Sequence, residues 1–338
     1  MKRILILHTG GTITMQLHDN QNVTSGFKAS SQISFNLEYF NRQVPGLQEI
    51  ARIESKTLFL EDSSNMVPGR WVSLAGAIEE HYSDFDGFVI LHGTDTMAYT
   101  ASALSFGLEN ISKPVIFTGS QVPLSNRRTD ARRNLINSVE LATLNLPEVC
   151  ICFNDRVYRG NRATKISIGD FDAFASPNHP VLGEFGVNLE IRSSYRPDAS
   201  ALRNRAVFDP RIGLLKLYPG MDFARVIPND GSEVRALVIE AYGSGNLPSG
   251  LDHTLLPALE RYIQGGGTVI ITSQAVYDEV DLDKYEGGKK ARDIGALPAG
   301  DMTTEACVTK IMYLLANYDD INTIRDLFRE NLAGERTY

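Results

Sequence analysis

Residues 88–97 of this 338-residue chain read FVILHGTDTM. Four apolar residues form a short run, a small polar turn follows, and apolar side chains then recur every three or four positions through Leu108. This pattern predicts a buried strand, a turn and a helix. In an open α/β sheet, ligands bind beyond the carboxyl ends of the strands. Thr94 and Asp95 are therefore candidate functional residues.

The composition is typical of a globular protein, with 43% hydrophobic and 22% charged residues, enough for the core of one large or two medium domains. A net charge of −8 argues against a nucleic-acid partner, because proteins that bind nucleic acids usually carry a positively charged surface. No run approaches the ~18 apolar residues of a membrane span. The first apolar segment ends at His8, which is too short for a signal peptide. We expect a cytoplasmic protein without a membrane partner.

Three cysteines are too few for a disulfide framework. Cys150 and Cys152 alternate within one apolar run, so on a strand they would share a face, and Cys307 lies far away. This usage favours reduced core cysteines over a metal site.

Strand patterns alternate with helix patterns in both halves of the chain, which is typical of α/β domains with mostly parallel sheets. Residues 193–211 are polar and lack an apolar period, so we predict a linker there. The predicted architecture is a larger N-terminal domain, 1–192, with a doubly wound sheet, and a smaller C-terminal α/β domain, 212–338. The charge-rich stretches 156–165 and 286–290 are expected to be surface loops.

The first predicted strand, residues 4–7, runs into the glycine-rich turn HTGGTIT. Thr12 then follows the carboxyl end of a strand, as Thr94 does. A simple turn with a threonine cap and a functional hydroxyl are both compatible with this pattern. Residues 16–34 are polar and lack periodicity, and their place directly after this turn favours a mobile lid.

Thr12, Thr94 and Ser120 offer hydroxyl groups at three separate strand ends. A hydroxyl nucleophile needs a partner that takes its proton, and a partly desolvated lysine such as Lys165 can do so. The neighbouring carboxylate of Asp95 suits an ammonium group on a substrate. These parts favour acyl transfer by a threonine, with backbone N–H groups near the glycine turns stabilising the oxyanion.

Several segments together resemble one known family. They read TGGTI at 9–13, HGTDTM at 92–97, KPVIFTGSQ at 113–121 and YRGNR at 158–162, with DSS at 62–64, YGSGN at 242–246 and GDMT at 300–303. With these segments in this order along the sequence, the chain resembles the bacterial L-asparaginases, most closely their cytoplasmic type I branch. The resemblance extends over nearly the whole chain.

The resemblance implies hydrolysis of the side-chain amide of L-asparagine to L-aspartate and ammonia, without a metal or cofactor. Thr12 would be the nucleophile. Thr94, Lys165 and Asp95 would form a second catalytic group, in which Thr94 and Lys165 relay the proton. Such enzymes assemble as homodimers or homotetramers. The implied substrate-binding residues are Asp62, Ser63, Ser64, Thr94 and Asp95. The structural alternative for the 62–64 stretch is an Asx turn or helix N-cap.

The chain departs from the family pattern in its loop after the nucleophile. Family members usually carry a tyrosine there, but no tyrosine occurs between Thr12 and Tyr39.

A second departure concerns an effector site for asparagine that some type I members build with an arginine and a cysteine. Glu240 and Ala275 stand at the matching positions, whereas Thr164 and Asn246 match. Because an anion replaces a cation, we predict that an allosteric response to asparagine is weak or absent.

Two other functions fit the same motifs. One is an amidase subunit that feeds ammonia to a tRNA-linked amidotransferase, although such subunits usually carry an extra N-terminal domain and Thr12 follows Met1 closely. The other is a non-catalytic amino-acid sensor, against which the retained Thr12, Thr94, Asp95 and Lys165 weigh.

Overall fold

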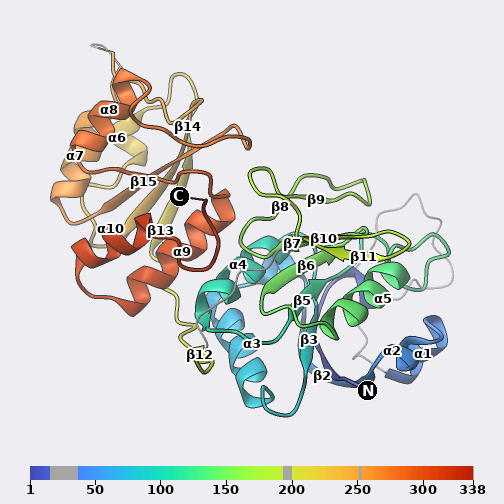
Figure 1. Cartoon of the computed structure of the whole chain (residues 1–338). Helices are drawn as coiled ribbons and strands as arrows, with labels where there is room; N and C mark the ends of the chain where they lie inside the picture. The colour runs from blue at the N-terminus through green and yellow to red at the C-terminus, as the bar shows by residue number, and fades with distance from the viewer. Residues whose placement is uncertain (16–36, 193–199, 251–252, 338) are drawn as a thin grey trace. The chain divides into compact units, whose positions relative to one another are not determined.

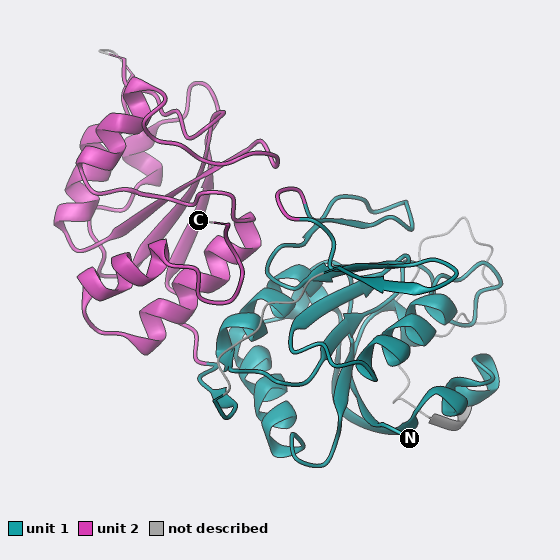
Figure 2. Ribbon diagram, in the orientation of Figure 1, with its two compact units in different colours: residues 1–176, 180–206 teal, residues 177–179, 207–338 magenta. Residues whose placement is uncertain are grey.

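The computed structural model describes residues 1–15, 37–192, 200–250 and 253–337. The chain forms two compact units, residues 1–176 with 180–206 and residues 177–179 with 207–338 (Figure 2). Each unit is an α/β layer structure, which confirms the predicted fold class. Part of the expected linker, 193–199, and the expected lid at 16–34 lie outside the described residues. The predicted boundaries at 192 and 212 stay a prediction, with 200–206 in the first unit and 207–211 in the second.

The first unit is built on a sheet whose described strands run in the order β11-β10-β7-β6-β5-β3-β1-β2 (Figure 1). The strands from β2 to β6 pair in parallel, and β7, β10 and β11 extend the sheet in antiparallel fashion. The carboxyl ends of β1, β3 and β5 therefore meet at one edge. The bounds are β1 Arg3–Gly10, β2 Arg52–Glu61, β3 Gly87–Leu91, β5 Val115–Thr118, β6 Val149–Phe153, β7 Arg156–Arg159, β10 Gly183–Phe185 and β11 Leu189–Ile191.

Helices cover both faces of this sheet, as the doubly wound prediction requires. Ile4 and Ile6 on β1 share a core cluster with Leu135 and Val139 of α5, while α3 and α4 pack together on the other face. Burial on both sides explains the continuous apolar runs of the central strands. The helices are α1 Leu37–Gln43, α2 Leu47–Ile50, α3 Pro68–Glu80, α4 Met97–Gly107 and α5 Ala131–Ala142, with short 3-10 turns η1 Thr12–Thr14 and η2 Ser63–Asn65. Smaller pairings join β4 Leu108–Glu109 to β12 Arg203–Asn204 and β8 Thr164–Lys165 to β9 Phe174–Ala175.

The prediction of a solvated loop at 156–165 is wrong. Arg156–Arg159 is strand β7, and Tyr158 is buried with its hydroxyl donating to the Phe174 carbonyl at 2.9 Å. The Arg159 guanidinium is buried against Glu148, Nε to Oε2 2.8 Å. A carboxylate outside the 156–165 stretch thus allows a charged side chain in the interior, which the charge pattern of that stretch does not reveal.

The second unit contains four described strands, all parallel, in the order β13-β14-β15-β16. Its core includes Leu237, Ile239 and Ile271 from the strands and Leu259 from α7. The bounds are β13 Ile212–Lys216, β14 Ala236–Ala241, β15 Thr268–Ser273, β16 Leu297–Pro298, α6 Phe223–Val226, α7 Leu256–Gln264, α8 Glu286–Asp293, α9 Thr304–Asn317 and α10 Ile321–Arg329.

The surface loop expected at 286–290 is wrong, because these residues form helix α8. A Cβ at Gly287 would lie 2.2 Å from the Leu247 carbonyl oxygen, and one at Gly288 would lie 2.8 Å from the Leu282 carbonyl oxygen. The two glycines therefore let the helix pack directly on neighbouring backbone. Paired glycines lower helix propensity, and this is why the sequence pattern resembles a loop.

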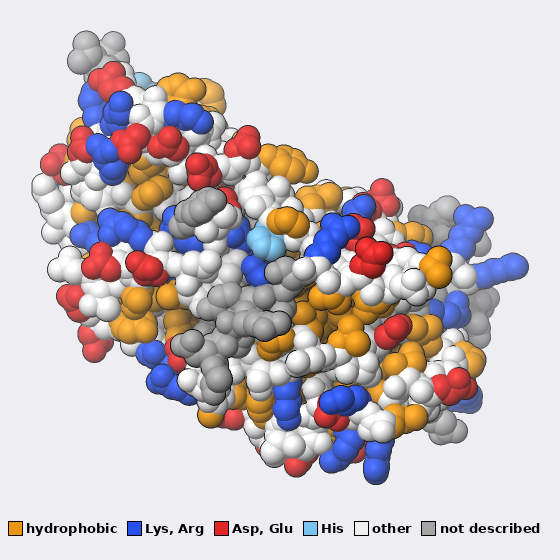
Figure 3. Space-filling model, viewed as in Figure 1, with side chains coloured by type: hydrophobic (Ala, Val, Ile, Leu, Met, Phe, Trp, Pro, Cys, Tyr) orange, Lys and Arg blue, Asp and Glu red, His pale blue; other side chains and the backbone are white. Residues whose placement is uncertain are grey.

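All three cysteines are free thiols buried in the core, which confirms their predicted role. Burial raises the pKa of Cys152 and of Cys307 to about 12. On the face drawn in Figure 3, acidic and basic side chains are interspersed over both units. Within the described residues, no helix is both long enough and apolar enough to cross a membrane.

Candidate active site

Glycines bring the turns at the carboxyl edge of the first unit's sheet into backbone contact. A Cβ at Gly11, whose φ is +92°, would lie 2.6 Å from the Gly93 nitrogen. A Cβ at Gly93 would lie 2.6 Å from Ser63 Oγ, and one at Gly119 would lie 2.4 Å from the His92 carbonyl oxygen. The turns after β1, β2, β3 and β5 are therefore neighbours, and only glycine fits at these contacts.

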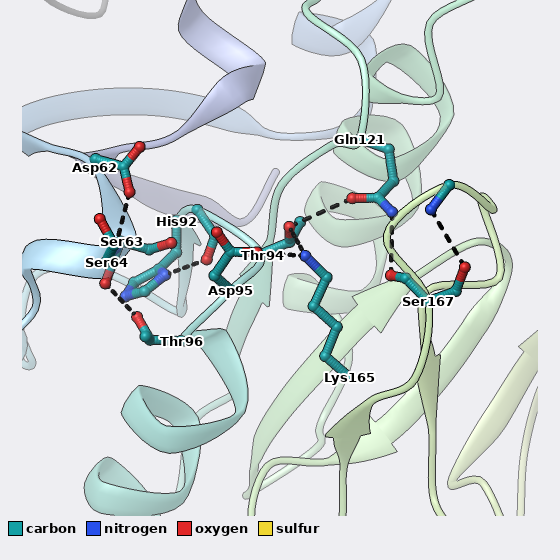
Figure 4. A network of polar contacts seen from close by, with 12 residues as sticks. Asp62, Ser63, Ser64, His92, Thr94, Asp95, Thr96, Gln121, Lys165 and Ser167 are labelled. Carbon is teal, nitrogen blue, oxygen red and sulfur yellow. Dashed lines mark hydrogen bonds and ion pairs between the residues drawn. The ribbon is translucent and has the colours of Figure 1, made fainter. Parts of the chain in front are cut away.

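The structure places two of the predicted residues, Thr94 and Asp95, within hydrogen-bond distance of a third, Lys165 (Figure 4). Lys165, at the end of β8, donates from Nζ to Thr94 Oγ1 at 2.8 Å and to Asp95 Oδ1 at 2.5 Å. The Lys165 side chain is 15% exposed, whereas the Asp95 side chain is 63% exposed. A partly desolvated amine thus contacts a hydroxyl on one side and a solvent-facing carboxylate on the other.

Gln121 completes this group, although the sequence pattern singled out its neighbour Ser120. Thr94 Oγ1 donates to Gln121 Oε1 at 3.3 Å, and Gln121 Nε2 donates to the carbonyl oxygens of Ser167 and Asp170 at 3.4 and 3.0 Å. The Ser120 hydroxyl is buried and has no hydrogen-bond partner among the described residues. Both residues follow β5, and the sequence does not indicate which one points toward Thr94.

The Asp62 carboxylate caps the turn η2, as the Asx-turn alternative predicts. Its Oδ1 accepts from the Ser64 backbone N–H at 2.8 Å, and this bond holds the pKa of Asp62 below its usual value. Thr96 Oγ1 donates to the Ser63 carbonyl at 2.8 Å and ties this turn to the start of α4. Thr96 is a further residue that sequence reasoning missed.

Thr12 is half-buried at the start of η1, directly after Gly11. Thr14 Oγ1 donates to the Gly11 carbonyl at 3.2 Å and lies 3.0 Å from His8 Nε2. Because the hydroxyl proton is used on Gly11, His8 Nε2 is the donor to Thr14. Burial lowers the pKa of His8 to about 4, so this histidine is neutral at neutral pH. A buried neutral side chain therefore supports the turn that carries Thr12.

The remaining predicted residues are divided between the two units. Thr164 precedes Lys165 on β8 of the first unit, whereas Asn246 belongs to the second unit, where its Oδ1 accepts from the Leu247 N–H at 3.1 Å. Glu240 is also in the second unit, and its Oε1 accepts from Thr304 Oγ1 at 3.0 Å. The described part of the chain contains no group of three His, Cys, Asp or Glu side chains that could hold a metal ion.

Comparisons with known proteins identify the family of this chain. The family model for the asparaginase N-terminal domain matches residues 3–197, and that for the glutaminase/asparaginase C-terminal domain matches residues 211–328. L-asparaginase 1 of Escherichia coli K12 is 41% identical over 99% of this chain and 98% of its own length. The fold and these matches define a hydrolase of the asparaginase class. The chain belongs to the asparaginase family, and it is an enzyme of that family rather than a non-catalytic sensor.

Solved structures of similar proteins extend the match. The thermostable L-asparaginase from Thermococcus kodakarensis superposes with a TM-score of 0.89 at 33% identity, covering 99% of both chains. L-asparaginase I from Vibrio cholerae superposes with a TM-score of 0.87 at 35% identity, covering 100% of this chain and 99% of the other. One component of the glutamyl-tRNA(Gln) amidotransferase of Pyrococcus abyssi is 31% identical, and the match covers all of this chain and 77% of that component's length.

Proposed function

We propose that this enzyme hydrolyses L-asparagine to L-aspartate and ammonia through an acyl-enzyme on Thr12. One observation carries the proposal: Lys165 Nζ lies 2.8 Å from Thr94 Oγ1, on the sheet edge where the Gly11 turn contacts Gly93. The family match and the identity to L-asparaginase 1 support the substrate.

In the first step of the proposed reaction, the Thr12 oxygen bonds to the side-chain carbonyl carbon of asparagine. The Thr12 proton passes through the Thr94–Lys165 pair to the leaving nitrogen, Lys165 being unprotonated when it accepts. Backbone N–H groups of the glycine turns stabilise the oxyanion. The C–N bond breaks, ammonia leaves, and Thr12 holds a β-aspartyl ester.

In the second step, water attacks the ester carbonyl and gives a proton to the same Thr94–Lys165 pair. The ester bond breaks, aspartate leaves, and the proton returns to the Thr12 oxygen. One amide and one water are consumed for one carboxylate and one ammonium ion, the ammonia taking up the proton that the new carboxylic acid loses, so the atoms balance without an added reactant.

Charge placement suits the two polar ends of the substrate. We assign the α-ammonium group to the solvent-facing carboxylate of Asp95 and to Asp62, whose lowered pKa keeps it ionised at neutral pH. Ser63 and Ser64 supply hydroxyl groups for the α-carboxylate. We further propose a cytoplasmic homodimer or homotetramer, with Thr164 and Asn246 as effector or interface residues, on the resemblance to type I enzymes.

The proposal is tested by measuring ammonia and aspartate released by the purified chain from asparagine, with glutamine in parallel. We expect equimolar ammonia and aspartate from asparagine, and a loss of roughly 10³-fold or more in kcat for Thr12→Ala, as for other removed nucleophiles. Thr143→Ala, at the far end of α5, is the matched control and should keep full activity. Absence of ammonia release by the wild-type chain, or full activity of Thr12→Ala, would overturn the proposal.

A further inference from the structure

A buried carboxylate holds the backbone that carries Gln121. Asp130, 5% exposed at the start of α5, accepts from the Gln121 N–H at 3.0 Å through Oδ2 and from the Val122 N–H at 3.1 Å through Oδ1. Asn134 Nδ2 donates to Asp130 Oδ2 at 3.1 Å and to the Gly119 carbonyl at 3.1 Å. Both ends of the segment after β5 are therefore fastened to the first turn of α5.

The direction of the Gln121 amide is fixed by its other contacts. Its NH₂ group lies 3.4 and 3.0 Å from the carbonyl oxygens of Ser167 and Asp170, which only accept hydrogen bonds. The amide oxygen must then face Thr94, as Figure 4 shows. Because this oxygen has no hydrogen to give, Thr94 is the donor in the 3.3 Å contact.

The Thr94 hydroxyl thereby has a defined set of partners. It donates its hydrogen to Gln121 Oε1 and accepts from Lys165 Nζ on one lone pair. Its second lone pair is left available to accept a proton from another group. Without Gln121, the hydroxyl hydrogen would rotate freely and could occupy the direction of that second lone pair.

We propose that Gln121 and Asp130 are positioning residues for amide hydrolysis. Before the reaction, Gln121 holds the Thr94 hydroxyl hydrogen off the lone pair that receives the Thr12 proton, and Asp130 holds Gln121. When the unprotonated Lys165 accepts, the hydroxyl turns this hydrogen from Gln121 Oε1 to Lys165 Nζ. The inference rests on the function proposed above. Neither residue exchanges a proton with the substrate; both act through Thr94.

The first test replaces Gln121 by leucine, which keeps the approximate volume and removes both amide groups. We expect kcat for asparagine to fall about tenfold, which corresponds to ~1.4 kcal/mol, with KM changed less than about twofold. Gln48→Leu, an exposed position on α2 of the same unit, is the matched control and should keep the wild-type kcat.

The second test uses Gln121→Glu, whose protonated carboxyl group is neutral and has the shape of the amide. It can accept from Thr94 and donate to one of the two carbonyls, but the ionised form has no hydrogen for either. Among the described residues, Lys165 and Asp95 lie beyond Thr94, and the Asp130 carboxylate accepts from the Gln121 N–H at the start of α5. Asp170, in the loop after β8, offers its backbone carbonyl to the side chain at position 121. We expect the ratio of the variant's kcat to the wild-type kcat to rise as the pH falls toward the pKa of this glutamate, whereas the ratio for Gln121→Leu stays level.

The third test replaces Asp130 by asparagine, which places an NH₂ group opposite a backbone N–H donor. We expect a lower kcat with an unchanged KM, whereas the exposed control Asp84→Asn should behave as the wild type.

Wild-type kcat in Gln121→Leu, with Thr12→Ala inactive, would overturn this inference and leave the proposed function standing. A wild-type chain that releases no ammonia from asparagine would instead overturn the function itself. If Asp130→Asn does not fold, the two Gln121 variants still decide the matter.

Discussion

Replacing Gly93 by alanine would insert a methyl group between the turn that carries Thr94 and the turn that carries Ser63. The added Cβ would lie 2.6 Å from Ser63 Oγ, 2.7 Å from Ser63 Cβ and 3.3 Å from the Ser63 nitrogen. Ser63 is buried and its carbonyl is bound by Thr96, so neither its short side chain nor its backbone has room to yield. The η2 turn must move away from Thr94.

The size of the effect follows from two separate costs. Overpacking of a buried contact destabilises a fold by ~1–3 kcal/mol. A displacement of about 1 Å between groups that hold and attack the substrate lowers the rate by roughly 10²-fold. We therefore expect Gly93→Ala to lose about 1–3 kcal/mol in the free energy of unfolding and about 10²-fold in kcat/KM for asparagine.

Gly76→Ala on helix α3 is the matched control, because a Cβ there would meet no atom within 4 Å. Higher helix propensity should raise its free energy of unfolding by ~0.5–1 kcal/mol, with kcat/KM unchanged. Urea unfolding and a coupled ammonia assay measure both quantities. A Gly93→Ala enzyme with kcat/KM within about twofold of the wild type would refute the claim that these two turns must touch.

Three further predictions concern the amine, the buried histidines and a buried ion pair. Lys165→Met keeps the approximate length of the side chain but removes the amine, so kcat measured by ammonia release should fall by ~10²-fold or more. The circular dichroism spectrum should be unchanged. Near-normal turnover would exclude Lys165 from the proton relay. Burial lowers the pKa of His8 and of His92 from 6.5 to about 4, so the unfolded state binds more protons than the folded state between these pH values. Each histidine should therefore remove up to ~3 kcal/mol from the free energy of unfolding as the pH falls from 6.5 to 4. Urea unfolding at a series of pH values should show that the free energy of unfolding of His8→Gln changes less with pH than that of the wild type; an equal pH dependence would be evidence against burial of His8 in its neutral form. Lys310 Nζ and Glu335 Oε1 lie 2.5 Å apart, and neither side chain is exposed. Glu335→Gln should therefore lower the free energy of unfolding by ~3–5 kcal/mol, because it leaves a buried charge without its counter-ion. A change under about 1 kcal/mol would show that the Lys310 ammonium group does not need the Glu335 carboxylate.

Local patterns were sufficient where a segment's own residues determine its structure. The strand, turn and helix around residues 88–97 follow from an apolar run and a change of period, and β3 and α4 have the predicted order. The two α/β units follow from the alternation of such patterns. Thr94, Asp95 and Lys165 were singled out by residue type, and their contact was then found in the structure.

Non-local contacts explain what the sequence did not reveal. Arg159 is buried because Glu148 is its ion-pair partner, and the glycines of α8 leave room for backbone segments outside the helix to pack against it. Gln121 instead of Ser120 reaches Thr94 because Asp130 and the carbonyls after β8 fix its direction. In each case the deciding partner lies outside the strand, helix or turn concerned, so the pattern of that segment contains no record of it.

The central claim is that Thr12 forms a covalent bond with the substrate at the site completed by Thr94 and Lys165. The most direct measurement is mass spectrometry of the enzyme quenched in acid during turnover of asparagine and then digested. The account predicts a β-aspartyl adduct on the peptide that contains Thr12, absent from Thr12→Ala. An adduct on the peptide of Thr94 or Lys165 instead, or turnover that survives in Thr12→Ala, would contradict it.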